Sequence, residues 1–188
     1  MDKKSERYRF SHLRSRSSRK PHVTCPPVRF FRCPVCGGFA HVMAEGAGAP
    51  VCCGQEMELQ LPREAVEVEP EIKLDYLIIG SLNENAVKVM WDCRDPEEKP
   101  AWIYLRTFIG GQIKYMTPKK RSPAIFGLTE EDAYAYCDKD PCVECAFRCK
   151  RGLELYYYFE RVGLVRLPLD RMATPRPVEK QAGTYFFD

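Results

Sequence analysis

Short apolar runs separated by polar turns dominate the chain from residue 71 onward. β-branched and aromatic residues alternate with Gly, Asn and Pro breaks, and the apolar runs cover 72–79, 86–91, 102–108, 112–116 and 124–128. Runs of this length and spacing, with no helical pattern between them, predict the strands of a β-sandwich. Residues 153–159 and 164–167 predict a hairpin that turns across Arg161-Val162-Gly163. The segment 129–136 fits either a short helix or a final strand.

The pattern divides the chain into a small and a large unit. Residues 30–62 predict a small domain with short strands at 39–43 and 50–52, and the acidic, proline-bounded segment 63–70 predicts an extended linker. The larger unit spans 71–167, and a proline-rich C-terminal tail follows over 168–188. The predicted fold class is therefore mainly β, a metal knuckle followed by an immunoglobulin-like sandwich with a C-terminal extension.

Composition supports a folded chain with one charged tail. The 188 residues are 45% hydrophobic and 12% aromatic, which is enough to bury a core. Residues 1–32 carry +8 and the remainder carries −5, although the net charge is only +3. We interpret residues 1–29 as a disordered, solvated tail; contact with nucleic acid or an acidic partner is the less favoured alternative.

Cysteine usage points to metal binding. The first thirty residues lack an apolar run of secretory length, and no hydrophobic stretch of 18 residues follows, so a soluble cytoplasmic protein without membrane contact is expected. In that reducing compartment, ten cysteines are better explained as metal ligands than as disulfides.

The strongest motif is a pair of cysteine pairs. Cys33 and Cys36 form a C-x-x-C turn, and after fifteen intervening residues Cys52 and Cys53 are adjacent. Four thiolates at this spacing can close on one zinc or iron ion. Adjacent residues point in opposite directions, so the second pair needs a bend, which Gly54 can supply. We expect a tetrahedron distorted by a widened angle at the adjacent pair; a disulfide there would be strained.

This motif carries a family resemblance. The C-x-x-C-G, the G-x-G and the C-C-G-x-x-M, which lie within 31–39, 45–48 and 51–57, resemble desulforedoxin and the N-terminal domain of desulfoferrodoxin. The resemblance implies mononuclear iron held by Cys33, Cys36, Cys52 and Cys53, one-electron chemistry, and pairing into a homodimer. From spacing alone, a structural zinc knuckle stays open.

A second resemblance covers the larger unit. Segments 102–105, 110–114, 123–126 and 135–137 are similar to the iron domain of superoxide reductases, in which four histidines and one cysteine hold the metal. This chain has three histidines, all upstream of that domain. Of the family's ligand positions, Cys137 is kept, and the resemblance places Asp92, Glu98 and Asp140 where histidines would stand. Superoxide reduction is therefore not carried over.

A last cysteine group suggests another centre. Cys137, Cys142, Cys145 and Cys149 follow a C-x4-C-x2-C-x3-C spacing that begins like a plant-type ferredoxin loop. We predict a second metal or iron–sulfur centre, with structural zinc or unliganded thiols as the alternatives. Cys93 is a fifth candidate, and Cys25 has no partner at metal-site spacing.

The patterns lead to one favoured function and two alternatives. We expect a non-haem iron redox protein that moves one electron through the four-cysteine site to a redox partner protein. The alternatives are a zinc-stapled, non-catalytic binding module, and a divergent superoxide reductase that uses the three carboxylates as iron ligands.

Overall fold

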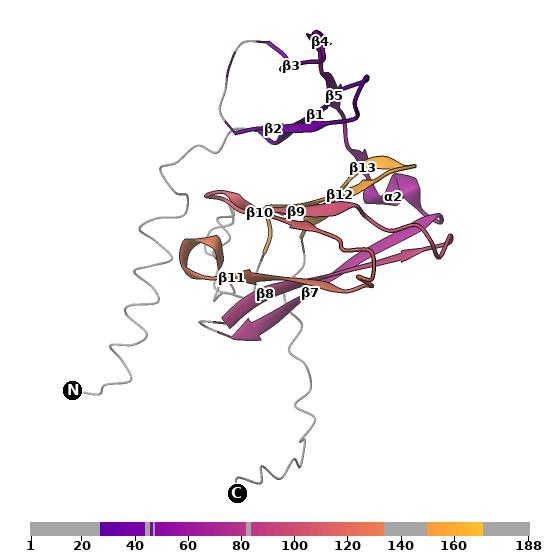
Figure 1. Ribbon diagram of the computed structural model, residues 1–188. Coiled ribbons are helices and arrows are strands. Elements are labelled where there is room, and N and C mark those ends of the chain that lie inside the picture. Colours follow the sequence, from indigo (N-terminus) through magenta and orange to yellow (C-terminus); the bar gives the residue numbers. More distant parts are fainter. Residues whose placement is uncertain (1–26, 44–45, 47, 82–83, 134–149, 171–188) are drawn as a thin grey trace, which may run out of the picture.

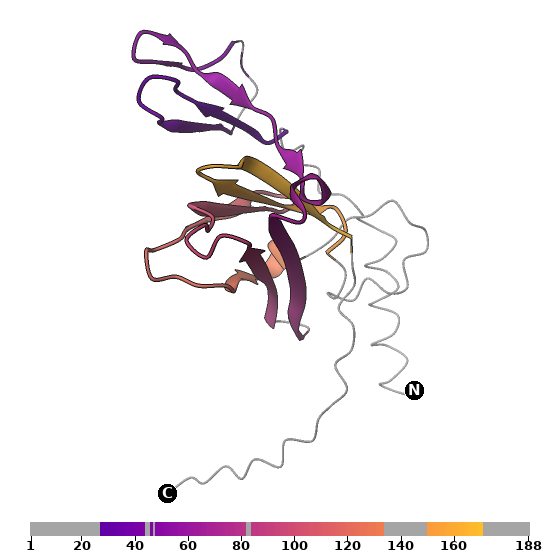
Figure 2. The same cartoon turned by 90° about the vertical axis from the view of Figure 1, so that its right-hand side faces the viewer.

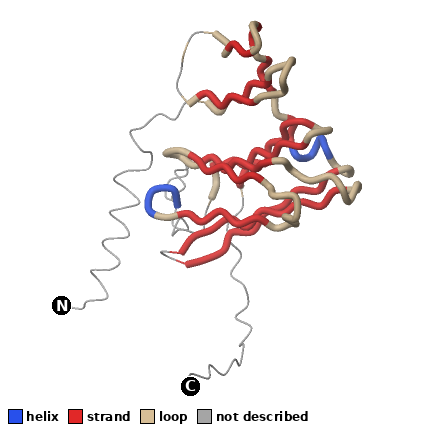
Figure 3. The backbone as a smooth tube through the Cα atoms, viewed as in Figure 1, coloured by secondary structure: helices blue, strands red, loops and turns tan. Residues whose placement is uncertain are grey.

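The chain folds into two β-rich units. The computed structural model describes residues 27–43, 46, 48–81, 84–133 and 150–170. A small domain lies above a two-layered β-sandwich (Figure 1). Strands make up most of the described chain, and its helical segments are α2 (Ala65–Val68) and the 3-10 turn η1 (Glu130–Ala133) (Figure 3). This confirms the mainly β class. The described part contains no helix both long and apolar enough to cross a membrane.

The sandwich consists of a larger and a smaller sheet that lie face to face (Figure 2). The larger sheet has the order β10 (Gly111–Tyr115), β9 (Trp102–Arg106), β12 (Leu153–Phe159), β13 (Gly163–Leu169) and β6 (Arg63–Glu64). The smaller sheet has the order β11 (Ala124–Leu128), β8 (Glu84–Cys93) and β7 (Ile72–Ser81). Neighbouring strands are antiparallel, except that β13 and β6 run parallel.

Period-two alternation places the core between the sheets. In β12, Leu155 and Tyr157 point inward and join a continuous buried cluster with Val87, Val89 and Phe126 of the smaller sheet. These five side chains are fully buried. The alternate residues of β12 point to the outer face, so the outer face of the larger sheet has its own packing.

Two regions differ from the sequence-based expectations. Residues 63–70 are not an extended linker: β6 pairs with β13, and α2 buries Ala65 and Val68 in the sandwich core. A capping box between Glu64 and Glu67 starts that helix. The hairpin predicted at 153–159 and 164–167 also has a more central place than its sequence indicates, because β12 is the middle strand of the larger sheet.

The small domain is a three-stranded sheet with a two-stranded hairpin beside it. The sheet has the order β2 (Phe39–Val42), β1 (Arg29–Arg32) and β5 (Glu58–Gln60), and the hairpin is β3 (Val51–Cys52) with β4 (Gln55–Glu56). Alternation in β1 sends Phe30 toward the sandwich and Phe31 toward the cysteines.

Aromatic side chains join the two units. Phe30 of β1 lies 5.0 Å from Trp102 and 5.7 Å from Tyr104, between ring centroids. Phe39 lies 4.5 Å from Tyr158, which stacks on Trp102 at 5.4 Å. We call these rings, with Tyr156, the aromatic layer. It covers one end of the outer face of the larger sheet, so the small domain is docked by apolar packing.

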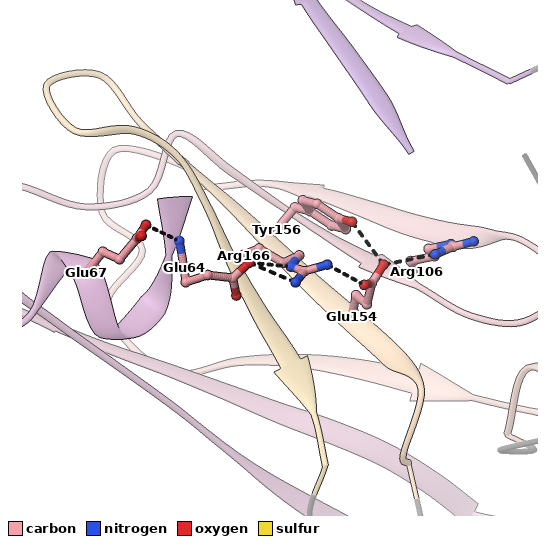
Figure 4. Close-up of polar contacts among 6 residues, drawn as sticks. All are labelled: Glu64, Glu67, Arg106, Glu154, Tyr156 and Arg166. Atoms are coloured by element: carbon pink, nitrogen blue, oxygen red, sulfur yellow. Dashed lines mark hydrogen bonds and ion pairs between the residues drawn. The ribbon is translucent and has the colours of Figure 1, made fainter. Parts of the chain in front are cut away.

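A charged network continues along the same outer face. Glu154 of β12 pairs with Arg106 of β9 at 2.9 Å and with Arg166 of β13 at 3.1 Å (Figure 4). Arg166 also reaches Glu64 of β6, and the Tyr156 hydroxyl donates to Glu154 at 2.9 Å. The network therefore crosses four neighbouring strands and borders the aromatic layer.

Candidate metal centre

The four predicted cysteines converge at the tip of the small domain. The Sγ atoms of Cys33, Cys36, Cys52 and Cys53 all lie within 4.8 Å of one another. Cys33 follows β1, Cys36 lies in the turn before β2, and the other pair lies at the β3–β4 hairpin. Among the residues that the structure describes, no other cluster of His, Cys, Asp or Glu side chains has this geometry.

The first pair is set by a tight knuckle. The Gly37 amide donates to the Cys33 carbonyl at 2.9 Å, and the Cys33 amide donates to the Gly38 carbonyl at 2.8 Å. Gly37 has a φ of 71°, which a glycine adopts without steric cost. The knuckle also turns the Cys36 amide toward the Cys33 sulfur, at 3.5 Å. Gly37 therefore lets the chain fold back after the first pair of cysteines.

The second pair is set by a two-residue hairpin. Cys52 pairs with Gln55 across the turn, and the turn residues Cys53 and Gly54 both have positive φ, 51° and 80°. Positive φ at both positions is the type I′ hairpin geometry, which usually places Asn and Gly there. Cys53 therefore holds a conformation that costs a non-glycine residue about 1–2 kcal/mol. The bend predicted at Gly54 begins one residue earlier.

The sulfur spacing fits a tetrahedral thiolate site. Cys36 and Cys52 sulfurs are 3.7 Å apart, and those of Cys52 and Cys53 are 3.8 Å apart. A tetrahedron with metal–sulfur bonds of about 2.3 Å has edges of about 3.8 Å. The residues therefore fit a zinc or iron ion. The S–metal–S angle between the adjacent cysteines was expected to be widened. The sulfurs of Cys52 and Cys53 are, however, no farther apart than in a regular tetrahedron.

The site has a buried side and an exposed side. Cys33 is 1% exposed and packs with Phe31 and Met57, whereas Cys36 and Cys53 are exposed. The exposed side carries Val35, which is 65% exposed, and Val51, which is 68% exposed. A metal here would thus be shielded from water on the β1 side and reachable at the tip.

Hydrogen bonds give the thiols of this cluster different pKa values. The Cys36 amide lowers the pKa of Cys33 to about 7, against the opposing effect of burial. The pKa of Cys52 is raised to about 12, first by its hydrogen bond with Cys36 and then by that with Cys33. The pKa of Cys53 is raised by the same partners, Cys36 first. The cage thus holds protons that a metal must displace.

Most of the other cysteines and carboxylates singled out in the sequence cannot be placed relative to this cage. Cys137, Cys142, Cys145, Cys149 and Cys25 lie outside the described residues, as does Asp140. Cys93 lies at the end of β8 in the sandwich, and burial followed by nearby Glu98 raises its pKa to about 11.

The carboxylates at the superoxide-reductase positions have other surroundings. Glu98 forms an ion pair with Arg161 at 2.6 Å, and Arg161 also pairs with Asp95. Asp92 is exposed at the end of β8. A 360 Å³ hollow lies beside these groups, lined by residues 91–93, 95–99, 118 and 120–122. Among the described residues, Asp92 and Glu98 belong to no group of three or more potential metal ligands.

Sequence reasoning missed two features around the site. The first is the ring of His41, which is exposed on β2 and yet stacks on Phe30 at 4.8 Å and meets Tyr104 at 5.0 Å. The second is Arg32, whose guanidinium lies over Phe39. The alternating aromatic residues of 102–104 and 156–158 were a signal for the first feature. A basic residue directly before a cysteine ligand was a signal for the second.

Comparisons with known proteins agree on the small domain. Residues 28–60 match the family described as desulfoferrodoxin, N-terminal domain. A desulfoferrodoxin homolog of Methanothermobacter thermautotrophicus is 49% identical over 43 residues. That alignment covers 23% of this chain and 34% of the relative, so it spans about a third of the curated protein.

A solved structure resembles a larger part of the chain. The superoxide reductase from Treponema pallidum aligns with 74% of this chain and 97% of its own chain. The alignment has 20% sequence identity and a TM-score of 0.46. Residues 28–60 are therefore the part that matches a desulfoferrodoxin N-terminal domain, and this part holds a four-cysteine cluster that can bind a metal.

Proposed function

We propose that this chain is a redox protein that holds one iron ion with Cys33, Cys36, Cys52 and Cys53. The observation that carries the proposal is the convergence of four sulfurs at the spacing of a tetrahedral site, within a segment that matches a desulfoferrodoxin domain. Iron bound in this way would supply a one-electron couple. The protein fixes the four donors on one short strand, one knuckle and one hairpin, so the cage geometry stays the same in both oxidation states.

The same residues determine where electrons enter and leave. Cys33 is buried against Phe31 and Met57, which keeps water from one side of the cage. Cys36 and Cys53 are exposed, and the apolar side chains of Val35 and Val51 are exposed near them. We place the docking site of the redox partner protein at this tip. A second copy of the chain is the competing occupant of the same surface.

The decisive experiment is metal analysis of the anaerobically purified full-length chain. We expect one iron per chain for this site, with visible absorption that bleaches on reduction and returns on oxidation. Cys36→Ser is expected to lose that iron, whereas Cys93→Ser, which changes a half-buried thiol of the sandwich, is expected to retain it. A colourless chain that contains only zinc would contradict this proposal and would support the alternative, a non-catalytic binding module that zinc stabilises.

We also propose a second metal or iron–sulfur centre at the cysteines of 137–149. Their C-x4-C-x2-C-x3-C spacing supports it, as does the anchoring of the flanking residues. Lys150 is fully buried and donates to the carbonyl of Ala133, so the two ends of this segment are held together. Acid-labile sulfide in the wild type, and its loss in Cys142→Ser/Cys145→Ser, would identify a cluster. Iron at one per chain without sulfide would exclude it.

A further inference from the structure

Arg32 connects the metal cage to the aromatic layer. It is the last residue of β1 and directly precedes Cys33. Its Cζ lies 6.0 Å from the centroid of the Phe39 ring, within cation–π range. A Cβ atom placed on Gly37 would lie 3.6 Å from its Nη2 and 4.0 Å from its Nε. The guanidinium therefore covers the backbone of the knuckle one residue away from Cys36.

The charge of Arg32 has no carboxylate partner in the described part of the chain. The ion pairs described there join Arg106, Arg161 and Arg166 to acids, and Arg32 is not among them. Its Nε is buried and makes no hydrogen bond with the described residues. A half-buried cation in an aromatic setting normally needs a counter-charge.

The cage can supply that counter-charge. Four thiolates on a ferric ion carry a net charge of about −1, and on a ferrous or zinc ion about −2. We propose that Arg32 is the positioning residue that balances this charge and thereby sets both the reduction potential and the metal affinity of the site. This inference rests on the proposed four-cysteine centre. A Cβ atom on Gly37 would meet the guanidinium only at ordinary van der Waals distance, so the glycine is needed for its positive φ, and Arg32 lies in contact with the turn that this φ creates.

The sign of the effect follows from the charges. A cation stabilises the more negative, reduced cage more than the oxidised one, so Arg32 raises the potential. Arg32→Gln should therefore shift the ratio of oxidised to reduced protein, at a fixed electrode potential, about three- to tenfold toward the oxidised form. A tenfold change corresponds to about 59 mV for a one-electron couple. Arg32→Lys keeps the charge and should recover at least half of the shift.

Arg29 offers a matched control. It lies on the same strand, is half-buried, and also has a buried Nε without a hydrogen bond. It is four residues from Cys33, roughly 13 Å along an extended strand. That distance exceeds the Debye length of about 10 Å at 0.1 M salt. Arg29→Gln should therefore change the logarithm of the oxidised-to-reduced ratio by less than a third of the change that Arg32→Gln causes.

The test uses the full-length chain in four forms: wild type, Arg32→Gln, Arg32→Lys and Arg29→Gln. Spectroelectrochemistry gives the potential, and chelator competition with Co²⁺ gives the affinity of the same cage without iron chemistry. We expect Arg32→Gln to lower both the potential and the Co²⁺ affinity more than the other two variants do, and by a similar factor in the two measurements. Equal potentials in wild type and Arg32→Gln, with equal Co²⁺ affinities, would overturn the inference.

The two measurements separate this inference from the proposed function. If the wild type shows no reversible iron signal, the redox proposal fails, and the Co²⁺ affinities still decide the role of Arg32. If Arg32→Gln does not fold, the comparison of wild type with Arg32→Lys across salt concentrations replaces it. An effect of Arg32 that is purely structural would leave Arg32→Lys as impaired as Arg32→Gln.

Discussion

The two units of this protein are held together by different kinds of interaction. In the sandwich, buried apolar side chains from both sheets form one continuous cluster. In the small domain, the buried cluster beside the cysteines consists of Phe31, Cys33 and Met57. A core of that size cannot offset the conformational entropy of some thirty residues. The sandwich thus folds by burial of its own core, whereas we expect the small domain to depend on metal binding for most of its stability.

Removal of the metal should have the largest effect. Chelation, or Cys33→Ser, removes a binding free energy that is about 10 kcal/mol or more in structural thiolate sites, and the small domain should lose its structure. Hydrogen exchange should show unprotected amides in β1, β2 and β5 and protected amides in β12. Cys93→Ser is the control and should leave both patterns unchanged. Loss of protection in both units at once would contradict the comparison.

Truncation of the sandwich core should have the next largest effect. Phe126 is fully buried between the sheets, so Phe126→Ala should lower the free energy of unfolding by about 3–5 kcal/mol. Urea denaturation followed by Trp fluorescence measures this. Ile125→Ala, on the neighbouring residue that is 50% exposed, should cost much less. Metal affinity should change little in either variant, and a parallel loss of metal would show that the units depend on each other.

A fall in pH should lower the metal affinity of the small domain more than it lowers the stability of the sandwich. Because the pKa values of Cys52 and Cys53 are raised, both thiols still hold protons between pH 7 and 9, and the metal must displace them. Affinity should therefore rise with pH, by at least about 100-fold per unit in this window. Below pH 7, the point at which Cys33 also takes up a proton, the dependence should steepen. Chelator competition at fixed ionic strength measures it, and a slope below one proton would contradict the arrangement of thiols.

Neutralising the charged network should have the smallest effect. Glu154→Gln keeps the shape of the side chain but leaves Arg106 and Arg166 without their shared carboxylate. The free energy of unfolding should fall by about 1–2 kcal/mol, because these groups are only partly exposed. Glu160→Gln, at an exposed position just beyond the same strand, should stay within about 0.5 kcal/mol of the wild type. An equal loss in both variants would mean that the network contributes nothing specific.

Much of the strand pattern was readable from the sequence, because half-buried strands alternate with a period of two. The runs at 124–128 and 153–159 coincide with β11 and β12, and the knuckle cysteines were placed by spacing and resemblance. The pairing of β6 was not readable, since two residues in a parallel ladder leave no pattern. The capping box that starts α2 was not readable either, because Glu64 stands where the usual sequence signature has Ser, Thr, Asp or Asn.

The roles of individual aromatic residues required the structure. Tyr156, Tyr157 and Tyr158 look equivalent in sequence, yet the middle one enters the sandwich core and its neighbours face the small domain. Alternation predicts that they separate, but it does not say which face a second domain will cover. Arg32 was missed for a similar reason, because its partners Gly37 and Phe39 become neighbours only when the knuckle folds back.

Strand β1 has only four residues, yet its two faces pack against different parts of the molecule. Phe30 packs against the aromatic rings of the sandwich, and Phe31 packs in the cluster that contains Cys33. A slip of one position would exchange these two rings and misplace Cys33 together with them. The docking of the small domain and the placement of its sulfurs therefore depend on the same strand register, and one residue inserted within β1 should disrupt both.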